Sequence, residues 1–282
     1  MTIRKFVAGA LPGVILVLLV AVFAGSRLFR RSIEQEVERR FAGAGTGPGD
    51  AVTEAMLADL PEPVQRYLRY SGVVGQSIPR TIRLQQTGRF RTAPDQPWMA
   101  ITANEYYTTG EPSFLWDATF HMYGLPVLRV RDSYIGGGGR MLGTLVGLVP
   151  VVDGQGDGID QGSMLRYLQE VVWFPAAFLM EEIAFAPIDD HSAEVMFTYG
   201  GRTVSGALHV DDEGRPTNFV AERFQSDEAG YATWTTPMTE YGEFEGLLLP
   251  VEGKGVWLLP AGEFEYIDVT VTLIEYDVAE AY

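Results

Sequence analysis

EFEYIDVTVTLIEY, residues 263–276, is the segment from which the architecture of this chain is best inferred. Aliphatic side chains occupy every second position from Ile267 to Leu273, and polar side chains occupy the positions between them. This period of two is typical of a β-strand with one buried face. Thirteen steps of about 3.3 Å give roughly 43 Å, well beyond a strand of five or six residues. Such a long, one-sided strand predicts a strongly curved sheet that wraps around its own helices, an apolar ligand, or both.

The same alternation recurs through most of the chain after residue 79. Residues 82–90 alternate between apolar and polar side chains, and residues 98–108 and 114–122 behave likewise. The connections between predicted strands are short, so neighbouring strands are expected to pair antiparallel. Further strands are predicted at 183–188, 193–199, 202–210, 216–225, 231–244 and 254–259.

A central insert is predicted between these two groups of strands. It comprises the glycines at 136–139, a weakly amphipathic stretch, the loop DGQGDGID at 153–160 and a helix from Ser163 to about Trp173. The apolar part of this insert, residues 161–180, is the candidate to fill or cap the concave side of the sheet. The predicted fold class is therefore α+β: a strongly curved, mostly antiparallel, half-barrel-like sheet with helices on its concave side, preceded by one N-terminal transmembrane helix.

The N-terminal segment FVAGALPGVILVLLVAVF (residues 6–23) contains eighteen residues without a charge. A helix of this length covers roughly 27 Å, close to the hydrocarbon thickness of a bilayer. A signal peptide cut after Ala24 is one interpretation; an uncleaved anchor is favoured, because the apolar run is long and basic residues follow it. We therefore expect an anchor and juxtamembrane helix at 1–41, a flexible linker at 42–50, and a single β-rich domain at 51–282.

Charge is distributed unevenly along the chain. The net charge is −16, and residues 1–41 contribute seven basic and three acidic side chains, so residues 42–282 carry −20. A domain this acidic repels phosphate backbones, which argues against nucleic-acid binding. Lysine and arginine flank the predicted span on both sides, and their count mildly favours a cytoplasmic domain. The short N-terminal tail is typical of an export signal instead, so we expect a single-pass membrane protein whose domain lies outside the cytoplasm.

Few residues offer catalytic or metal chemistry. The chain has no cysteine and only three histidines, none at a metal-binding spacing, and it lacks a GxSxG nucleophile motif. GGGGR at 136–140 lacks the Lys-Ser/Thr of a phosphate-binding loop. DGQGDGID resembles half of a calcium loop, but Met164 stands where a bidentate glutamate is required. No catalytic residue, metal or cofactor is therefore predicted.

Aromatic residues are the remaining signal for a site. Aromatic side chains at strand spacing form either a core or the wall of a concave apolar pocket. The residues expected at inward positions, and predicted to bind a ligand if a pocket exists, are Trp116, Phe120, Trp173, Phe174 and Trp257.

Five segments in the same order carry a resemblance to a known family: LPEPVQRYLRYSG (60–72), LRYLQEVVWFPAAFL (165–179), PIDDHSAEVMF (187–197), GRTVSGALHVDDEGRPTNFVAERF (201–224) and the continuation at 241–277. They resemble a family of uncharacterised bacterial proteins, a domain of unknown function often found behind an N-terminal span. The resemblance covers most of residues 55–277, and it implies no catalytic residues. The alternating pattern is also similar, more distantly, to the curved half-barrel of periplasmic lipoprotein carriers.

The leading functional hypothesis is a membrane-anchored, non-enzymatic protein that binds a lipid-like or other apolar ligand at the cell envelope. Its partners are then the bilayer, through residues 6–23, and an apolar small ligand, with any protein partner unknown. Two alternatives stay open. One is an acidic interaction module that docks a basic protein. The other is a hydrolase that uses carboxylates such as Glu181, Glu182, Asp189 and Asp190.

Overall fold

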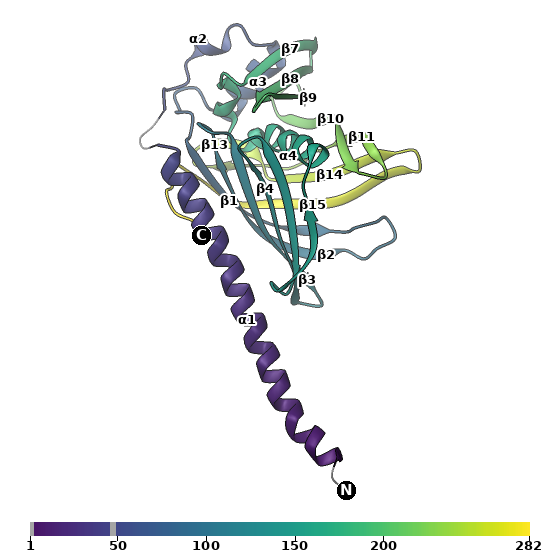
Figure 1. Ribbon diagram of the computed structural model, residues 1–282. Coiled ribbons are helices and arrows are strands. Elements are labelled where there is room, and N and C mark those ends of the chain that lie inside the picture. Colours follow the sequence, from purple (N-terminus) through teal and green to yellow (C-terminus); the bar gives the residue numbers. More distant parts are fainter. Residues whose placement is uncertain (1–2, 46–48) are drawn as a thin grey trace.

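A single antiparallel sheet of thirteen strands dominates the computed structural model, which describes residues 3–45 and 49–282 (Figure 1). Its strands in spatial order are β6 (Val149–Gly154), β5 (Gly138–Leu145), β4 (Leu125–Ile135), β3 (Ser113–Met122), β2 (Met99–Thr108), β1 (Thr81–Phe90), β15 (Gly262–Tyr276), β14 (Glu252–Leu259), β11 (Gly230–Thr235), β10 (Pro216–Ser226), β9 (Arg202–Val210), β8 (Ser192–Tyr199) and β7 (Ile183–Asp189). Two meanders, β1–β6 and β7–β15, therefore join where the first strand pairs with the last. The hairpin of β12 (Tyr241–Phe244) and β13 (Leu247–Pro250) is separate.

The joining strand β15 carries two irregularities that bend it. Its pairing slips by one residue against β1 near Thr272 and against β14 near Tyr266. Such bulges kink a strand and increase its twist, so a long strand curves instead of running flat. They also exchange the faces of the strand. Leu273 is 37% exposed and Ile274 is buried, so the predicted face from Ile267 to Leu273 is wrong at its last residue.

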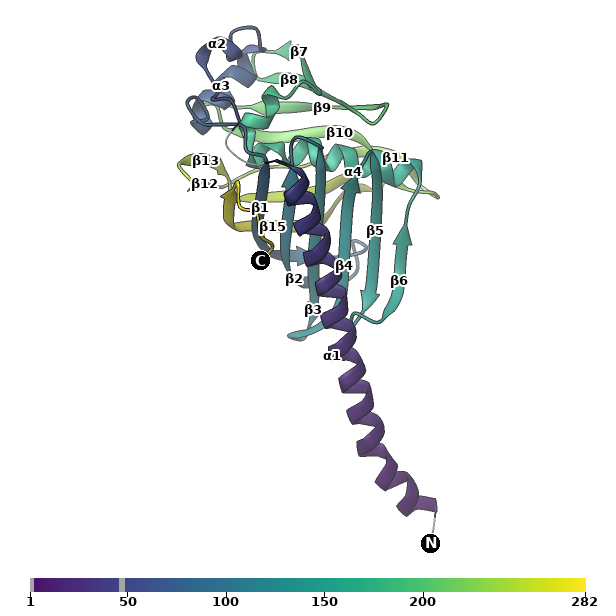
Figure 2. The same ribbon diagram turned by 60° about the vertical axis from the view of Figure 1, so that its left-hand side comes forward.

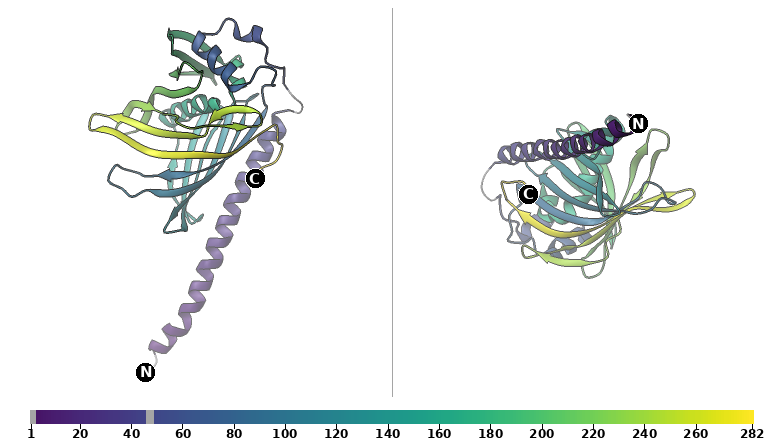
Figure 3. Two further views of the ribbon diagram at one scale, coloured as in Figure 1. Left: turned by 180° about the vertical axis from the view of Figure 1, so that it is seen from behind. Right: turned by 90° about the horizontal axis from the view of Figure 1, so that it is seen from below.

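The apolar part of the predicted insert, residues 161–180, lies on the concave side of the sheet. Helix α4 (Asp157–Glu170) and the short turns η1 (Val171–Trp173) and η2 (Pro175–Leu179) connect the two edge strands, β6 and β7. The helix packs against β4 and β5 on one side and β9 and β10 on the other, and the sheet curves around it (Figure 3). It begins six residues before the predicted start at Ser163, within DGQGDGID, because Asp157 and Asp160 suit its first turn.

Strands β5 and β6 occupy the weakly amphipathic stretch that was expected between the glycines at 136–139 and residue 153. Strand β4 lies before those glycines, where no strand was predicted. It was missed because it is covered on both faces, so its buried positions do not alternate. Arg129 faces Asp117 and Asp132 faces Arg166, which places charged residues at buried positions. Gly136 and Gly137 form the tight turn between β4 and β5, and Gly138 and Gly139 begin β5, in place of a bend into an insert.

Helix α1 (Ile3–Gly43) is continuous through the predicted juxtamembrane segment. Its C-terminal half packs on the convex face of β2 and β3, where Ile33, Val37 and Phe41 contact Tyr106 and Leu115. Its N-terminal half extends beyond the sheet (Figure 2). No helix in the described part of the chain is both long and apolar enough to cross a bilayer. Most side chains of the span predicted at residues 6–23 lie outside the described part of the chain.

Two short helices precede the sheet. Helix α2 (Glu54–Leu57) follows Thr53 and is a single turn. Helix α3 (Glu62–Ser71) ends at Gly72, whose φ of 81° supplies the left-handed cap. It packs against β8 and β9 at the end of the sheet opposite to the protruding part of α1. Residues 46–48 of the predicted linker lie outside the described residues.

The junction between the two meanders depends on a close backbone approach at Gly88. A Cβ atom at this position would lie 2.2 Å from the carbonyl oxygen of Asp268 on β15, and backbone has no means to move aside locally. We expect Gly88→Ala to lower the free energy of unfolding by about 1–3 kcal/mol or more, measured by urea denaturation. The matched control is Gly110→Ala, where a Cβ would meet no atom within 4 Å. Equal stability of the two variants would contradict this account of the junction.

Candidate functional site

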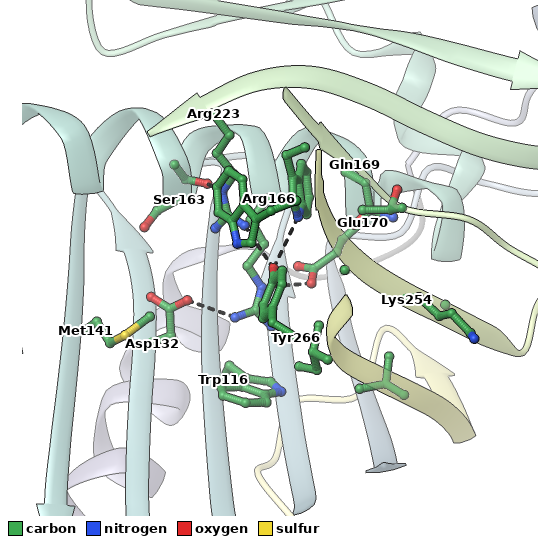
Figure 4. A pocket seen from close by; sticks show the side chains of 18 of the residues that line it. Trp116, Asp132, Met141, Ser163, Arg166, Gln169, Glu170, Arg223, Lys254 and Tyr266 are labelled. Atoms are coloured by element: carbon green, nitrogen blue, oxygen red, sulfur yellow. Dashed lines mark hydrogen bonds and ion pairs between the residues drawn. The ribbon is translucent and has the colours of Figure 1, made fainter. Parts of the chain in front are cut away.

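A cavity of about 320 Å³ lies between α4 and the concave face of the sheet (Figure 4). Strands β1, β3, β4 and β5 form one part of its wall, and β10, β11, β14 and β15 form the other. Helix α4 and the turn η1 complete the enclosure through residues 158–173. This volume is at the lower end of the range of roughly 300–1,000 Å³ that small-molecule sites occupy.

Four tryptophans make the wall largely apolar. Three of their indole N–H groups already donate within the protein: Trp116 to Gln86 Oε1 at 2.9 Å, Trp173 to the Pro250 carbonyl at 3.1 Å and Trp234 to the Tyr266 hydroxyl at 3.2 Å. The polar edge of each of these rings is therefore satisfied, and what remains for a ligand is the apolar ring surface. Apolar contact is thus the main chemistry that the wall offers. The aromatic lining residues are Phe90, Trp116, Trp173, Phe224, Trp234, Trp257 and Tyr266.

The five aromatic residues predicted from the sequence divide between wall and core. Trp116, Trp173 and Trp257 line the cavity. Phe120 lies behind the wall, with its ring edge-on to Trp116 at 6.2 Å between centroids. Phe174 instead packs in the core, 4.9 Å from the ring of Tyr107. The sequence argument missed Trp234 and Tyr266, although both lie on predicted strands, because the inward face of those strands could not be assigned.

A buried ion cluster forms part of the cavity wall through Asp132, Arg166 and Glu170. The guanidinium of Arg166 on α4 donates to Glu105 on β2 at 2.7 Å, to Asp132 on β4 at 2.8 Å and to Glu170 on its own helix at 2.8 Å. The hydroxyl of Tyr107 donates to the second oxygen of Glu170 at 3.1 Å. One side chain thus ties the helix to two strands of the sheet, and all three of its nitrogens have partners.

The cluster holds more potential negative charge than positive charge. Burial raises the pKa of Glu105 well above its usual value and also raises that of Glu170, and Arg166 offsets only part of this effect. Burial opposes the charge on Arg166, but the surrounding carboxylates outweigh it and hold its pKa above the ordinary value. Glu105 Oε2 and Asp132 Oδ1 have no hydrogen-bond partner in the protein. Asp132 lines the cavity, and its unpaired oxygen is buried.

Two further cations lie along the wall, and both are already engaged. Arg223 donates from Nε to the Gly162 carbonyl at 3.1 Å and from Nη1 to the Tyr266 hydroxyl at 3.3 Å. Lys254 pairs with Glu265 at 3.2 Å. Figure 4 shows Arg223 and Lys254 on different sides of the Arg166 cluster. Polar groups therefore surround the aromatic wall without a converging set of free donors.

The other predicted candidates lie elsewhere. The cavity beneath α4 is lined by none of the predicted carboxylates Glu181, Glu182, Asp189 and Asp190. Asp189 accepts hydrogen bonds from the backbone N–H of His191 at 2.9 Å and from the Ser192 hydroxyl at 2.7 Å, which fixes the turn between β7 and β8.

In the segment that resembles a calcium loop, Asp153 pairs with Arg140 at 2.9 Å and Asp157 with Arg202 at 3.2 Å. Across residues 3–45 and 49–282, no three His, Asp or Glu side chains are placed to hold a metal ion together.

The buried carboxyls predict how stability depends on pH. A carboxyl whose pKa is raised by folding binds its proton more tightly in the folded state, so stability falls as pH rises above the ordinary carboxyl pKa. Glu105→Gln removes one such group while keeping its shape. We expect the urea concentration at the unfolding midpoint of the native protein to decrease as the pH rises from about 5 to 8. The midpoint of the Glu105→Gln variant should decrease by less over the same range. Each pKa unit removed corresponds to about 1.4 kcal/mol.

The control for this measurement is Glu263→Gln on the exposed part of β15, which should follow the native protein. A Glu105→Gln curve parallel to the native curve over the whole range would show that Glu105 does not carry the effect.

Two solved structures are similar to this chain in overall fold. A LolA superfamily protein from Nitrosomonas europaea matches 76% of this chain and 91% of its own, with 11% sequence identity and a TM-score of 0.41. A DUF1329 family protein from Desulfovibrio piger matches 82% of this chain and 95% of its own, with 10% identity and a TM-score of 0.44. These likenesses concern the arrangement of the backbone alone.

No curated protein matches the sequence significantly. The sequence profile of a family of unknown function, DUF6544, matches residues 50–269. This range includes every residue that lines the large cavity, and it confirms the resemblance to a domain of unknown function. The chain therefore belongs to the DUF6544 family.

Proposed function

We propose that this protein binds one lipid-like or otherwise apolar small ligand in the cavity beneath α4. The observation that carries the proposal is the wall of four tryptophans, three of which have their indole N–H groups satisfied within the protein. A wall of that kind gains free energy from apolar contact and does not require a polar ligand. The volume of about 320 Å³ suits a single acyl chain or a compact ring system better than a whole phospholipid.

The ion cluster suggests which polar group such a ligand carries. Each nitrogen of Arg166 already donates to a carboxylate, so its positive charge is matched within the protein and attracts a carboxylate or phosphate head group only weakly. Asp132 lines the cavity and its buried Oδ1 has no hydrogen-bond partner in the protein, so it is the acceptor that a donor group of the ligand would satisfy. A ligand whose polar end donates a hydrogen bond, such as a hydroxyl or an amine, satisfies that oxygen. An anionic end adds charge beside a cluster that already holds three carboxylates.

The same proposal includes a membrane anchor at residues 6–23. Twelve of these eighteen residues are Leu, Ile, Val or Phe. At about −0.3 to −0.6 kcal/mol each, they favour insertion by roughly 4–7 kcal/mol. An anchored binding domain has its apolar ligand within reach in the adjacent bilayer. That the domain faces the outer side remains part of the proposal.

Filling the cavity tests the binding site. Gly253 lines the cavity, and a Cβ at this position would meet no atom within 4 Å, so Gly253→Leu starts from open space and adds volume there. We expect the purified full chain to bind dodecanol with quenching or shift of its tryptophan emission. The variant should bind at least about tenfold more weakly, which corresponds to 1.4 kcal/mol. Dodecanoate should bind more weakly than dodecanol to the native protein.

Gly110→Leu is the matched control, because it adds the same side chain in open space between β2 and β3, away from the cavity. Equal affinity of Gly253→Leu and Gly110→Leu for dodecanol would refute binding in this cavity. Tighter binding of dodecanoate would refute the hydrogen-bond-donor argument and leave the cavity proposal intact.

The anchor is tested by charge. Leu16→Lys together with Val20→Lys places two cations in the predicted span, each unfavourable by about 3 kcal/mol, which offsets the calculated gain from the apolar residues. We expect the native chain to stay with the membrane fraction after an alkaline carbonate wash and the double variant to be released. Retention of both proteins, or release of both, would contradict an anchor at 6–23.

A further inference from the structure

One end of the sheet exposes a cluster of large apolar side chains. The turns between β3 and β4 and between β5 and β6 lie at this end, where α1 leaves the body of the protein (Figures 1 and 2). Tyr123 is 98% exposed and Leu125 is 67% exposed, so neither side chain belongs to the core. We call this surface the apolar rim. Its exposed members are Met122, Tyr123, Leu125, Leu145, Leu148, Val149, Val151 and Val152.

The backbone of both turns favours smaller residues than those present. Tyr123 has φ of 52° and Val146 has φ of 47°, and each is followed by a glycine that also has positive φ. Asn, Asp or Gly is the usual choice at the first of these positions, and a β-branched valine is especially costly there. Bulky apolar residues thus occupy turn positions that local conformational preference disfavours. This pattern is expected where the side chain itself has a role.

The rim also lacks the acidic residues that cover the rest of the chain. Aspartate and glutamate number 37 of 282 residues, yet none occurs in residues 118–131 or 141–152. Arg27, Arg30 and Arg31 are exposed on the adjacent part of α1. The rim is therefore an apolar surface with cations beside it, on a protein that is otherwise strongly negative. A bilayer interface with anionic head groups complements both properties.

Contacts fix the rim at one level along α1. The Ser26 hydroxyl donates to the Val146 carbonyl at 3.1 Å, and Arg129 donates to the Ser26 carbonyl at 3.2 Å. Gly25 lies against Leu148 so closely that a Cβ there would clash with it. These contacts fall two or three residues after the end of the predicted span at Phe23. Beyond them toward the N-terminus, Leu16, Val20 and Phe23 are exposed on α1.

We propose that the apolar rim inserts into the interfacial layer of the bilayer and holds the sheet upright on the membrane, beside the point where α1 enters it. The occupant of this surface is the lipid interface. The inference rests on the proposed anchor for the position of the bilayer, but it concerns separate residues. It gives the domain one fixed orientation relative to the membrane.

The absence of native cysteine allows a direct test in the full chain. Single cysteines at Tyr123→Cys and Val151→Cys carry the fluorophore NBD, and Ile188→Cys on β7 at the opposite end of the sheet is the control, since Ile188 is 54% exposed. The proteins are reconstituted in vesicles of phosphatidylcholine and phosphatidylglycerol. We expect doxyl-labelled lipid to quench the two rim labels several-fold more than the control label, and iodide to quench them less.

Each outcome has a defined meaning. Rim labels that iodide reaches as readily as the Ile188→Cys label would refute the rim proposal while the anchor stands. A chain that does not associate with vesicles would refute both. Protection that disappears when the protein is diluted below one copy per vesicle would assign the rim to contact with a second copy and refute the lipid proposal. Tyr123→Glu should expose the Val151→Cys label to iodide if the turns insert together.

Discussion

One buried guanidinium holds the helix of this protein inside its sheet. Arg166 joins α4 to β2 and β4 through Glu105 and Asp132, and it also binds Glu170 one turn away. Its guanidinium carbon lies over two aromatic rings, 4.9 Å from the centre of Phe114 and 4.8 Å from that of Trp116. Removing one partner from such a buried pair typically costs about 3–5 kcal/mol, because the remaining charge stays buried without compensation. The position of α4, and therefore the cavity beneath it, depends on this contact.

The curvature of the sheet provides the space that this contact encloses. The bulges near Tyr266 and Thr272 bend β15 at the centre of the sheet, where both meanders meet. A flat sheet would contact α4 along the whole length of the helix and leave no cavity. The curvature of the sheet therefore creates the concave space, and the ion cluster determines how far α4 extends into it. The tryptophans line the volume that is left.

The distribution of charge links the two proposed surfaces. Acidic residues are spread over the domain but are absent from residues 118–131 and 141–152 at one end of the sheet. A strongly negative domain is repelled by anionic lipid, so only an acid-free end can approach the bilayer closely. The end that carries this surface is also the end from which α1 extends (Figure 1). An apolar cavity held near the bilayer in one orientation is the arrangement to which both proposals lead.

The sequence by itself determined the features that depend on local period and charge. Alternation at 263–276 predicted a long strand, and the helical pattern at 163–173 lies within α4 and η1. The alternation of apolar and polar side chains did not predict β4, because its charged residues Arg129 and Asp132 are buried against partners on other elements. A single sequence does not show which distant residues form such pairs. Only the tertiary structure decided which aromatic side chains line a cavity. Trp116 and Phe174 were both expected at inward positions, but Trp116 lines the cavity and Phe174 packs in the core. Long-range packing decides between them, because it sets the strand bulges and the depth of α4.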